Sequence, residues 1–382
     1  MQSTRTQSAS AGTQPRHDPV VWLILSEKTG DNAQLLALAE ALPWRCLTKR
    51  VAVREPYVFG KPRVSASLHH VDPMRSDALE PPWPDLVITI GRRMSMVALW
   101  VQLQAGGRTR LVLIGAPKGL ARRFDLTVVS DQYRKVHRSN LIRITYPLQR
   151  IDEVSIAAEA DACRSEFERF RRPLIAGLVG GSTKSVRFDA AVAARFVRDI
   201  TELAQREGGT LFVTTSRRTP SEVADVLERA LPADAILHRW AADGSWNPYR
   251  ALLGLADRFV VTGDSLSMQM EIVRLGRPLA IYPLPASSWF AGRRLGASPI
   301  DALVQRIAAV SRHRDLDAIP RRLVSDGYAV WFGEPFGLDG RRPPDELGHV
   351  AARVVALVRP HQVADESAVA SVGVNSESRV AS

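Results

Sequence analysis

The stretch Phe259-Val-Val-Thr-Gly-Asp-Ser-Leu-Ser-Met-Gln-Met-Glu-Ile-Val-Arg-Leu-Gly-Arg-Pro278 decides the fold of this chain. An apolar, β-branched run ends at Val261 and a small polar turn follows. A helix-like segment comes next, and Gly276 and Pro278 stop it before the apolar run 279–282. This order of strand, turn, helix and strand predicts one unit of a parallel sheet. Because the turn precedes a helix N-terminus, its backbone N–H groups and the helix dipole favour a bound phosphate.

The same stretch supplies candidate contacts to a nucleotide. Ser267 and Glu271 are four residues apart, so both can lie on one helix face near the N-terminus. A carboxylate there can accept hydrogen bonds from the two ribose hydroxyls. The pattern therefore predicts half of a nucleoside-diphosphate pocket, and an ordinary capped turn is the alternative. The predicted contacts are Thr262, Gly263, Asp264, Ser265, Ser267 and Glu271.

Composition describes an ordinary globular chain. Of its 382 residues, 45% are hydrophobic and 24% are charged. A chain of this length is long enough for two domains. The two cysteines, Cys46 and Cys163, are far apart, which indicates a reducing compartment and argues against a cysteine-rich metal site. No apolar run approaches the length of a transmembrane helix. We expect residues 1–19 and 361–382 to be disordered tails because they are polar and lack apolar periodicity.

The net charge of +11 is unevenly placed. Residues 21–150 carry 20 Lys and Arg against 10 Asp and Glu, whereas the rest of the chain carries 31 against 30. This asymmetry indicates a domain that meets an anionic membrane surface, a phosphorylated glycolipid or nucleic acid. A solvated, arginine-rich surface is an equally good interpretation. Nucleic acid is disfavoured because the basic half has no interleaved aromatic pattern and no recognition motif.

Alternating strands and helices predict two successive Rossmann-like units, so the expected fold class is α/β. The first unit spans 20–150, a linker helix spans 151–172, and the second unit spans 173–316. A final segment, 317–360, ends in a helix at 345–357 that we expect to pack back on the first unit. The predicted strands are 20–25, 46–53, 86–90, 110–114, 126–129 and 141–144, then 174–179, 210–214, 235–238, 259–261 and 279–282.

Two further loops that follow predicted strands of the second unit suit phosphate binding. The loop 180–184 begins with two glycines, which let backbone N–H groups approach a phosphate closely. The loop 215–220 carries adjacent arginines, whose forked guanidinium groups fit a diphosphate. Ordinary strand-ending turns with solvated arginines are the alternative. Neither a P-loop nor a GxGxxG spacing occurs, which counts against a nicotinamide dehydrogenase. The candidates here are Gly180, Gly181, Ser182, Lys184, Ser216, Arg217 and Arg218.

Several segments resemble, in order along the chain, the motifs of the mitochondrial-fission "elongated mitochondria" family. The segments are 26–34, 91–93, 180–182, 215–220, 247–249 and 262–271, and the resemblance covers about residues 20–360. It implies a GT-B fold, in which two facing Rossmann-like domains enclose a cleft. Bacterial members are treated as glycosyltransferases, some linked to the lipooligosaccharide outer core, and plant members are linked to organelle division.

The resemblance implies a hexosyltransferase that takes a nucleotide-sugar donor in the second domain and an anionic glycolipid acceptor in the first. Such enzymes generally need no metal and no cofactor, and we expect this one to lie at the cytoplasmic face of an inner membrane. Asp31 is the candidate general base, with Glu27 and His137 as runners-up and an N-cap as the alternative role of Asp31. Asn247 and Tyr249 would close the base pocket, with stacking from Trp246 or Tyr249.

Two other functions remain open at this stage. A sugar-nucleotide epimerase can share the fold and needs no acceptor, and a non-catalytic membrane or division scaffold would match the plant members. Arg92 and Arg93 would hold an acceptor phosphate or carboxylate, or else lie on the surface. The pair Asp315 and Asp317 matches the metal motif of other glycosyltransferases, but it follows a predicted helix rather than a strand end. We therefore expect no metal there.

Overall fold

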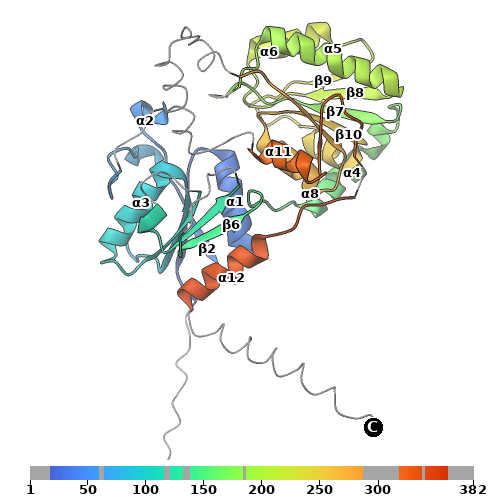
Figure 1. Ribbon diagram of the computed structural model, residues 1–382. Helices are drawn as coiled ribbons and strands as arrows, with labels where there is room; N and C mark the ends of the chain where they lie inside the picture. Colours follow the sequence, from blue (N-terminus) through green and yellow to red (C-terminus); the bar gives the residue numbers. More distant parts are fainter. Residues whose placement is uncertain are drawn as a thin grey trace, which may run out of the picture.

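The computed structural model describes residues 18–59, 64–115, 121–131, 138–183, 186–286, 318–337 and 340–359. These residues form two six-stranded sheets, one in the first part of the chain and one in the second (Figure 1). The strand orders are β2-β1-β3-β4-β5-β6 and β12-β11-β10-β7-β8-β9. Every pairing between these strands is parallel. The predicted α/β, GT-B-like class with two Rossmann-like domains is therefore confirmed.

The four central strands of the first sheet are runs of mainly apolar residues that are buried on both faces, as a parallel sheet between helices requires, whereas the edge strand β2 is largely exposed. Gly91, with a backbone φ of +79°, lets α3 begin directly after β3. The strands are β1 (Val21–Leu25), β2 (Cys46–Arg50), β3 (Leu86–Ile90), β4 (Arg110–Ile114), β5 (Leu126–Ser130) and β6 (Leu141–Ile144). The helices are α1 (Thr29–Glu40), α2 (Glu55–Phe59) and α3 (Gly91–Gln104), with 3-10 turns η1 (Pro73–Arg75) and η2 (Ala121–Arg123).

The second sheet follows the long helix α4 (Glu153–Phe167), which leads the chain out of the first domain. Its strands are β7 (Leu174–Leu178), β8 (Thr210–Thr214), β9 (Ile236–His238), β10 (Arg258–Thr262) and β11 (Leu279–Tyr282). Its helices are α5 (Ala190–Glu207), α6 (Ser221–Ala230), α7 (Tyr249–Leu255) and α8 (Leu266–Arg274). The sequence interpretation missed α7. The side chain of Asn247 accepts a hydrogen bond from the Tyr249 N–H at 2.9 Å and so begins this helix.

The last described segments belong to different domains. Helix α11 (Ala318–Ser325) and strand β12 (Val330–Trp331) extend the second domain, where β12 pairs with β11 at the sheet edge. Helix α12 (Leu347–Val358) instead lies beside α1 and the first sheet (Figure 1). Its buried residues Val350, Ala351 and Val354 join the core of the first domain. The chain therefore crosses between the domains twice. Within the described ranges, no helix is long and apolar enough to span a membrane.

Three loops lock together at the carboxyl-terminal edge of the second sheet. After β7, the N–H of Gly180 donates to Thr262 Oγ1 and the N–H of Gly181 donates to Asp264 Oδ2, each at 2.9 Å. Thr219, after β8, donates its hydroxyl to the carbonyl of Gly180 at 2.5 Å. A Cβ on Gly181 would lie 2.0 Å from the carbonyl oxygen of Arg218. The two glycines are needed because backbone and side chains approach too closely for any larger residue.

Gly181→Ala should therefore destabilise the second domain by about 1–3 kcal/mol, the usual cost of overpacking a close contact. Urea unfolding followed by tryptophan fluorescence measures this change. Gly348→Ala is the matched control, because Gly348 lies in α12 and a Cβ there would meet nothing within 4 Å. Alanine should be neutral or stabilising in that helix. Equal unfolding curves for the two variants would contradict the interlocked loops.

Candidate functional site

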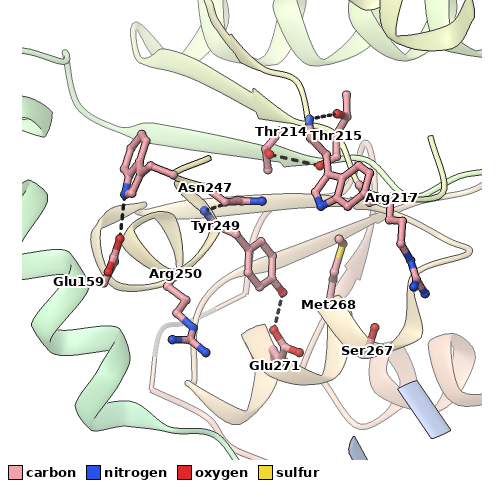
Figure 2. A pocket seen from close by; sticks show the side chains of 13 residues that line it. Glu159, Thr214, Thr215, Arg217, Asn247, Tyr249, Arg250, Ser267, Met268 and Glu271 are labelled. Atoms are coloured by element: carbon pink, nitrogen blue, oxygen red, sulfur yellow. Dashed lines mark hydrogen bonds between the residues drawn. The ribbon is translucent and has the colours of Figure 1, made fainter. Parts of the chain in front are cut away.

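A cavity of about 490 Å³ opens at the carboxyl-terminal edge of the second sheet (Figure 2). Its walls come from the ends of β8 and β9, from α7 and from the first two turns of α8, with one contribution from α4. Ligands of open α/β sheets bind at this edge. The lining residues are Glu159, Thr214, Thr215, Ser216, Arg217, Trp240, Trp246, Asn247, Tyr249, Arg250, Ser267, Met268 and Glu271.

Glu271 is the central polar group of this cavity. Its carboxylate accepts hydrogen bonds from the Tyr249 hydroxyl, at 2.5 Å, and from the Gln149 amide, at 3.0 Å. Burial raises the pKa of Glu271, while these two bonds and the charge of Arg250 lower it. Figure 2 shows the Tyr249 hydroxyl pointing at the carboxylate. A carboxylate offers about four lone-pair positions, so two remain for ligand hydroxyls.

The two neighbouring arginines of the β8 loop have different roles. Arg218 forms an ion pair with Asp264 at 2.7 Å and donates to the Ser265 hydroxyl at 2.8 Å. Arg217 lines the cavity and extends across to the first domain, where it donates to Thr29 Oγ1 at 3.4 Å. Arg218 is therefore engaged in holding the loops together. Arg217, like Arg250, lines the cavity.

The turn after β10 is engaged inside the protein to a greater extent than we expected. The side chain of Asp264 is fully buried, at 0% exposed, between Gly181 and Arg218. Gly263 donates its N–H to the carbonyl of Tyr282, and Thr262 accepts from Gly180. Ser265 occupies the N-cap position of α8 without a capping bond from its side chain. Of the six contacts predicted on this stretch, Ser267 and Glu271 are the ones that line the cavity.

The glycine-rich loop after β7 also differs from the expectation. The N–H groups of Gly180 and Gly181 donate to side chains and are not directed at a ligand, because the loop is packed against the β8 and β10 loops. Ser182 exchanges hydrogen bonds with the backbone of Phe188, at 2.9 and 3.1 Å. Ser216 donates its hydroxyl to the Gly180 carbonyl at 3.2 Å and also lines the cavity. Lys184 lies outside the described residues.

The aromatic wall differs from the sequence expectation in its members. The Tyr249 hydroxyl is committed to Glu271, and the burial of this side chain raises its pKa well above the ordinary value. Trp246, which we expected, and Trp240, which we did not, also line the cavity and are 48% and 37% exposed. The Trp246 indole donates to Glu159 at 2.8 Å, which fixes the ring plane. Two large exposed rings beside a cavity are suited to stacking on a flat ligand group.

The first domain contributes the N-terminus of α1. Asp31 lies in the first turn of this helix, 3.8 Å from the Lys28 ammonium, and its side chain is 24% exposed. Lys28 holds the N-cap position, so Asp31 is not the cap. Glu27 forms an ion pair with Arg75 at 2.6 Å. Because Thr29 meets Arg217, Asp31 lies in the same helical turn that faces the second domain.

The remaining first-domain candidates are less informative. His137 lies outside the described residues, as do Asp315 and Asp317. Arg93 donates to the Val58 carbonyl at 2.5 Å, and its own carbonyl contacts the buried His70. In the described part of the chain, no three His, Cys, Asp or Glu side chains are grouped so that they could hold a metal ion.

Several residues that line the cavity or contact Glu271 were not found from the sequence. Glu159 and Gln149 come from the linker region, where no motif marks them. Arg250 and Met268 directly follow the predicted residues Tyr249 and Ser267 in the sequence. The asparagine and proline before Tyr249 are a helix-start signal that would have placed Arg250 on a helix next to the pocket. The expected residues that the structure gathers in one cavity are Ser216, Arg217, Asn247, Tyr249, Ser267 and Glu271.

Comparisons with solved structures find several proteins of similar fold. MurG from Acinetobacter baumannii is 14% identical, with a TM-score of 0.44 over 91% of this chain and 94% of that one. A UDP-GlcNAc 2-epimerase from Neisseria meningitidis, bound to UDP-GlcNAc, is 11% identical, with a TM-score of 0.47 over 88% and 99%. The Escherichia coli ADP-heptose lps heptosyltransferase II is 15% identical, with a TM-score of 0.41 over 69% and 84%.

Comparisons of sequence identify the family. The Arabidopsis thaliana "Mitochondrial fission protein ELM1" is 25% identical over 228 residues, which are 54% of this chain and 53% of that protein. This chain therefore spans about half the length of that relative. An uncharacterized protein of Rickettsia prowazekii (strain Madrid E) is 23% identical over 298 residues, 69% of this chain and 83% of that protein. The family model described as "Mitochondrial fission ELM1" matches residues 29–298, well over half of the sequence. The chain belongs to the Mitochondrial fission ELM1 family.

Proposed function

We propose that this protein is a metal-independent glycosyltransferase that moves a sugar from a nucleoside-diphosphate donor to an anionic glycolipid of the lipopolysaccharide core type. The observation that carries the proposal is the arrangement of the cavity. Glu271 lies between Arg217 on one side and Arg250 on the other (Figure 2), and two exposed tryptophans, Trp240 and Trp246, line the same cavity. A nucleotide has the matching sequence of chemical groups: a flat base, a ribose with two hydroxyls, and a diphosphate.

The donor is proposed to lie along this cavity. The ribose hydroxyls donate to the carboxylate of Glu271, and the base stacks on the tryptophan wall that Trp246 closes. The diphosphate then extends toward Arg217, Ser267 and the N-terminus of α8. A guanidinium and a helix N-terminus stabilise the negative charge that develops on the leaving diphosphate, which is the work that a metal performs in other transferases.

The acceptor is proposed to enter from the first domain. Asp31, as general base, would take the proton of the acceptor hydroxyl while that oxygen bonds to the anomeric carbon and the bond from this carbon to the diphosphate breaks. The contact of Arg217 with Thr29 supports this role, because it brings the first turn of α1 next to the diphosphate end. The basic balance of residues 21–150 supports an anionic acceptor.

A thermal-shift screen with nucleoside mono- and diphosphates, with and without Mg²⁺, tests the donor proposal. One nucleoside diphosphate should raise the unfolding temperature without metal, because a ligand that binds only the folded state stabilises it. Hydrolysis or epimerisation of the sugar nucleotide without an acceptor would instead favour an epimerase. A folded sample that responds to no nucleotide would reject the donor site and favour the non-catalytic scaffold.

Arg217→Gln and Arg218→Gln form a matched pair. Arg217→Gln should weaken diphosphate binding roughly tenfold or more, because a charge-assisted hydrogen bond is lost, and it should leave stability unchanged. Arg218→Gln should lower stability instead, because it leaves the buried carboxylate of Asp264 without its cation. Calorimetric binding and urea unfolding measure the two effects. A stability loss in Arg217→Gln with normal binding would reverse the assignment.

Peripheral membrane association is the proposed route to a glycolipid acceptor. Binding to liposomes should require anionic lipid and should weaken as salt is added, because screening reduces the attraction of the basic domain. Flotation of the full chain with neutral and anionic vesicles measures this. Flotation that is independent of lipid charge and salt would contradict the electrostatic basis of the proposal.

A further inference from the structure

We infer that Gln149, on the linker between the two domains, is a positioning residue for the carboxylate of Glu271. The inference rests on the proposed nucleotide function, since Glu271 is the proposed ribose ligand. It goes further by making the ribose contact depend on a residue that belongs to neither sheet.

The carboxylate of Glu271 is held from two sides. Tyr249, on α7 of the same domain, donates to one oxygen, and Gln149 donates to the other at 3.0 Å. The same Gln149 amide lies 3.5 Å from the carbonyl of Ser267, one turn earlier on α8. A carboxylate with a donor on each oxygen cannot rotate freely. Its remaining lone pairs therefore keep a fixed direction, as a pair of ribose hydroxyls requires.

The linker is anchored to both domains just before Gln149. The Thr145 N–H donates to the carboxylate of Glu346, at the start of α12 in the first domain, at 2.8 Å. The Tyr146 hydroxyl donates to Asp326, directly after α11 of the second domain, at 2.7 Å. These two contacts place the amide of Gln149. After it, Arg150 forms an ion pair with Glu40 on α1 at 3.2 Å, but both side chains are 58% exposed, so this pair contributes little to the placement.

Helix α8 contacts the second crossing of the chain as well. Arg274, one turn after Glu271, donates to the carbonyl of Pro344 at 3.1 Å, on the segment that returns to the first domain. The side chain of Arg274 is 10% exposed, so this is a buried anchor. The helix that carries Glu271 is therefore tied to both interdomain crossings. A change in the path of the linker would change the direction of the carboxylate.

The groups around Glu271 set its pKa, so the proposed ribose contact should depend on pH. Burial raises the pKa of Glu271, and the bonds from Tyr249 and Gln149 and the charge of Arg250 lower it. Tyr249 stays protonated because burial and Glu271 raise its pKa. Removing the Gln149 amide takes away a bond to the ionised form, so the pKa of Glu271 rises further. Ribose hydroxyls bind the ionised form, so their contribution is present above this pKa and is lost as pH falls through it.

The test compares UDP with its 2′,3′-dideoxy analogue in wild type and in Gln149→Met, by calorimetry from neutral to acidic pH. The affinity for UDP divided by the affinity for the dideoxy analogue measures the contribution of the two ribose hydroxyls that meet Glu271. In wild type the ratio should fall as the solution is acidified. In Gln149→Met it should already be lower, by roughly tenfold, and its midpoint should lie at higher pH. Affinity for the dideoxy analogue should not change.

Arg150→Met is the matched control, because it removes the neighbouring linker contact, which lies on the first domain and away from Glu271. It should leave the ratio and its midpoint as in wild type. An unchanged ratio in Gln149→Met, or an equal change in both variants, would overturn the inference. If the screen selects another nucleoside diphosphate, that nucleotide and its dideoxy analogue replace UDP.

A second measurement separates this inference from the proposed function. Carboxyl-labelled glutamate gives an NMR signal for Glu271 that is identified by its loss in Glu271→Gln. This signal should titrate at higher pH in Gln149→Met than in wild type, without any nucleotide. Failure of every nucleotide to bind would reject the donor proposal alone. An identical titration in the two proteins would reject the positioning role of Gln149.

Discussion

The buried carboxylate of Asp264 is the constraint on which the rest of the site depends. Its side chain is fully covered, so its charge must be met inside the protein, and the Gly181 N–H and the Arg218 guanidinium meet it. These contacts join the loops after β7, β8 and β10. Arg217 precedes Arg218 in the chain, so the contacts that hold Asp264 also fix the backbone position of a cavity-lining arginine.

The division of work between adjacent residues is a recurring feature of this edge. Arg218 completes the interlock, whereas Arg217 extends into the cavity and reaches Thr29. Tyr249 supports Glu271 through its hydroxyl, whereas Trp246 remains exposed beside the cavity and is held by Glu159. In each pair one residue supplies rigidity and the other a contact surface. A binding group that is held by such supports loses little freedom when a ligand arrives.

The chain crosses between the two domains twice, and both crossing segments contact helix α8 at the carboxyl-terminal edge of the second sheet. The outgoing linker contributes Gln149 to Glu271, and the returning segment meets Arg274 on the same helix. Helix α12 then completes the core of the first domain with Val350 and Val354. The first domain is therefore built from both ends of the described chain. Helix α8, which bears the proposed ribose ligand Glu271, therefore contacts both segments that join the two domains.

The sequence by itself determined the order of the two units, the family resemblance and every named strand except the short edge strand β12. Apolar runs bounded by turns predicted β3, β4, β6, β8 and β11 with the bounds that the structure has, because residues buried on both faces leave a continuous apolar signal. Helix α7 was not predicted, because the asparagine and proline at its start are also typical of a loop. The motif at Thr262–Glu271 predicted where the cavity would lie, since carboxyl ends of parallel strands share one edge.

Only the tertiary structure decided which polar groups at that edge have partners inside the protein. The N–H groups of Gly180 and Gly181 and the carboxylate of Asp264 are consumed by contacts between residues more than 80 positions apart. Gln149 reaches Glu271 across 122 positions. The local sequence pattern indicates which side chains can bind a phosphate or a ribose. It does not report which of them are already satisfied, because hydrogen bonds between distant loops form only when the sheet brings those loops together.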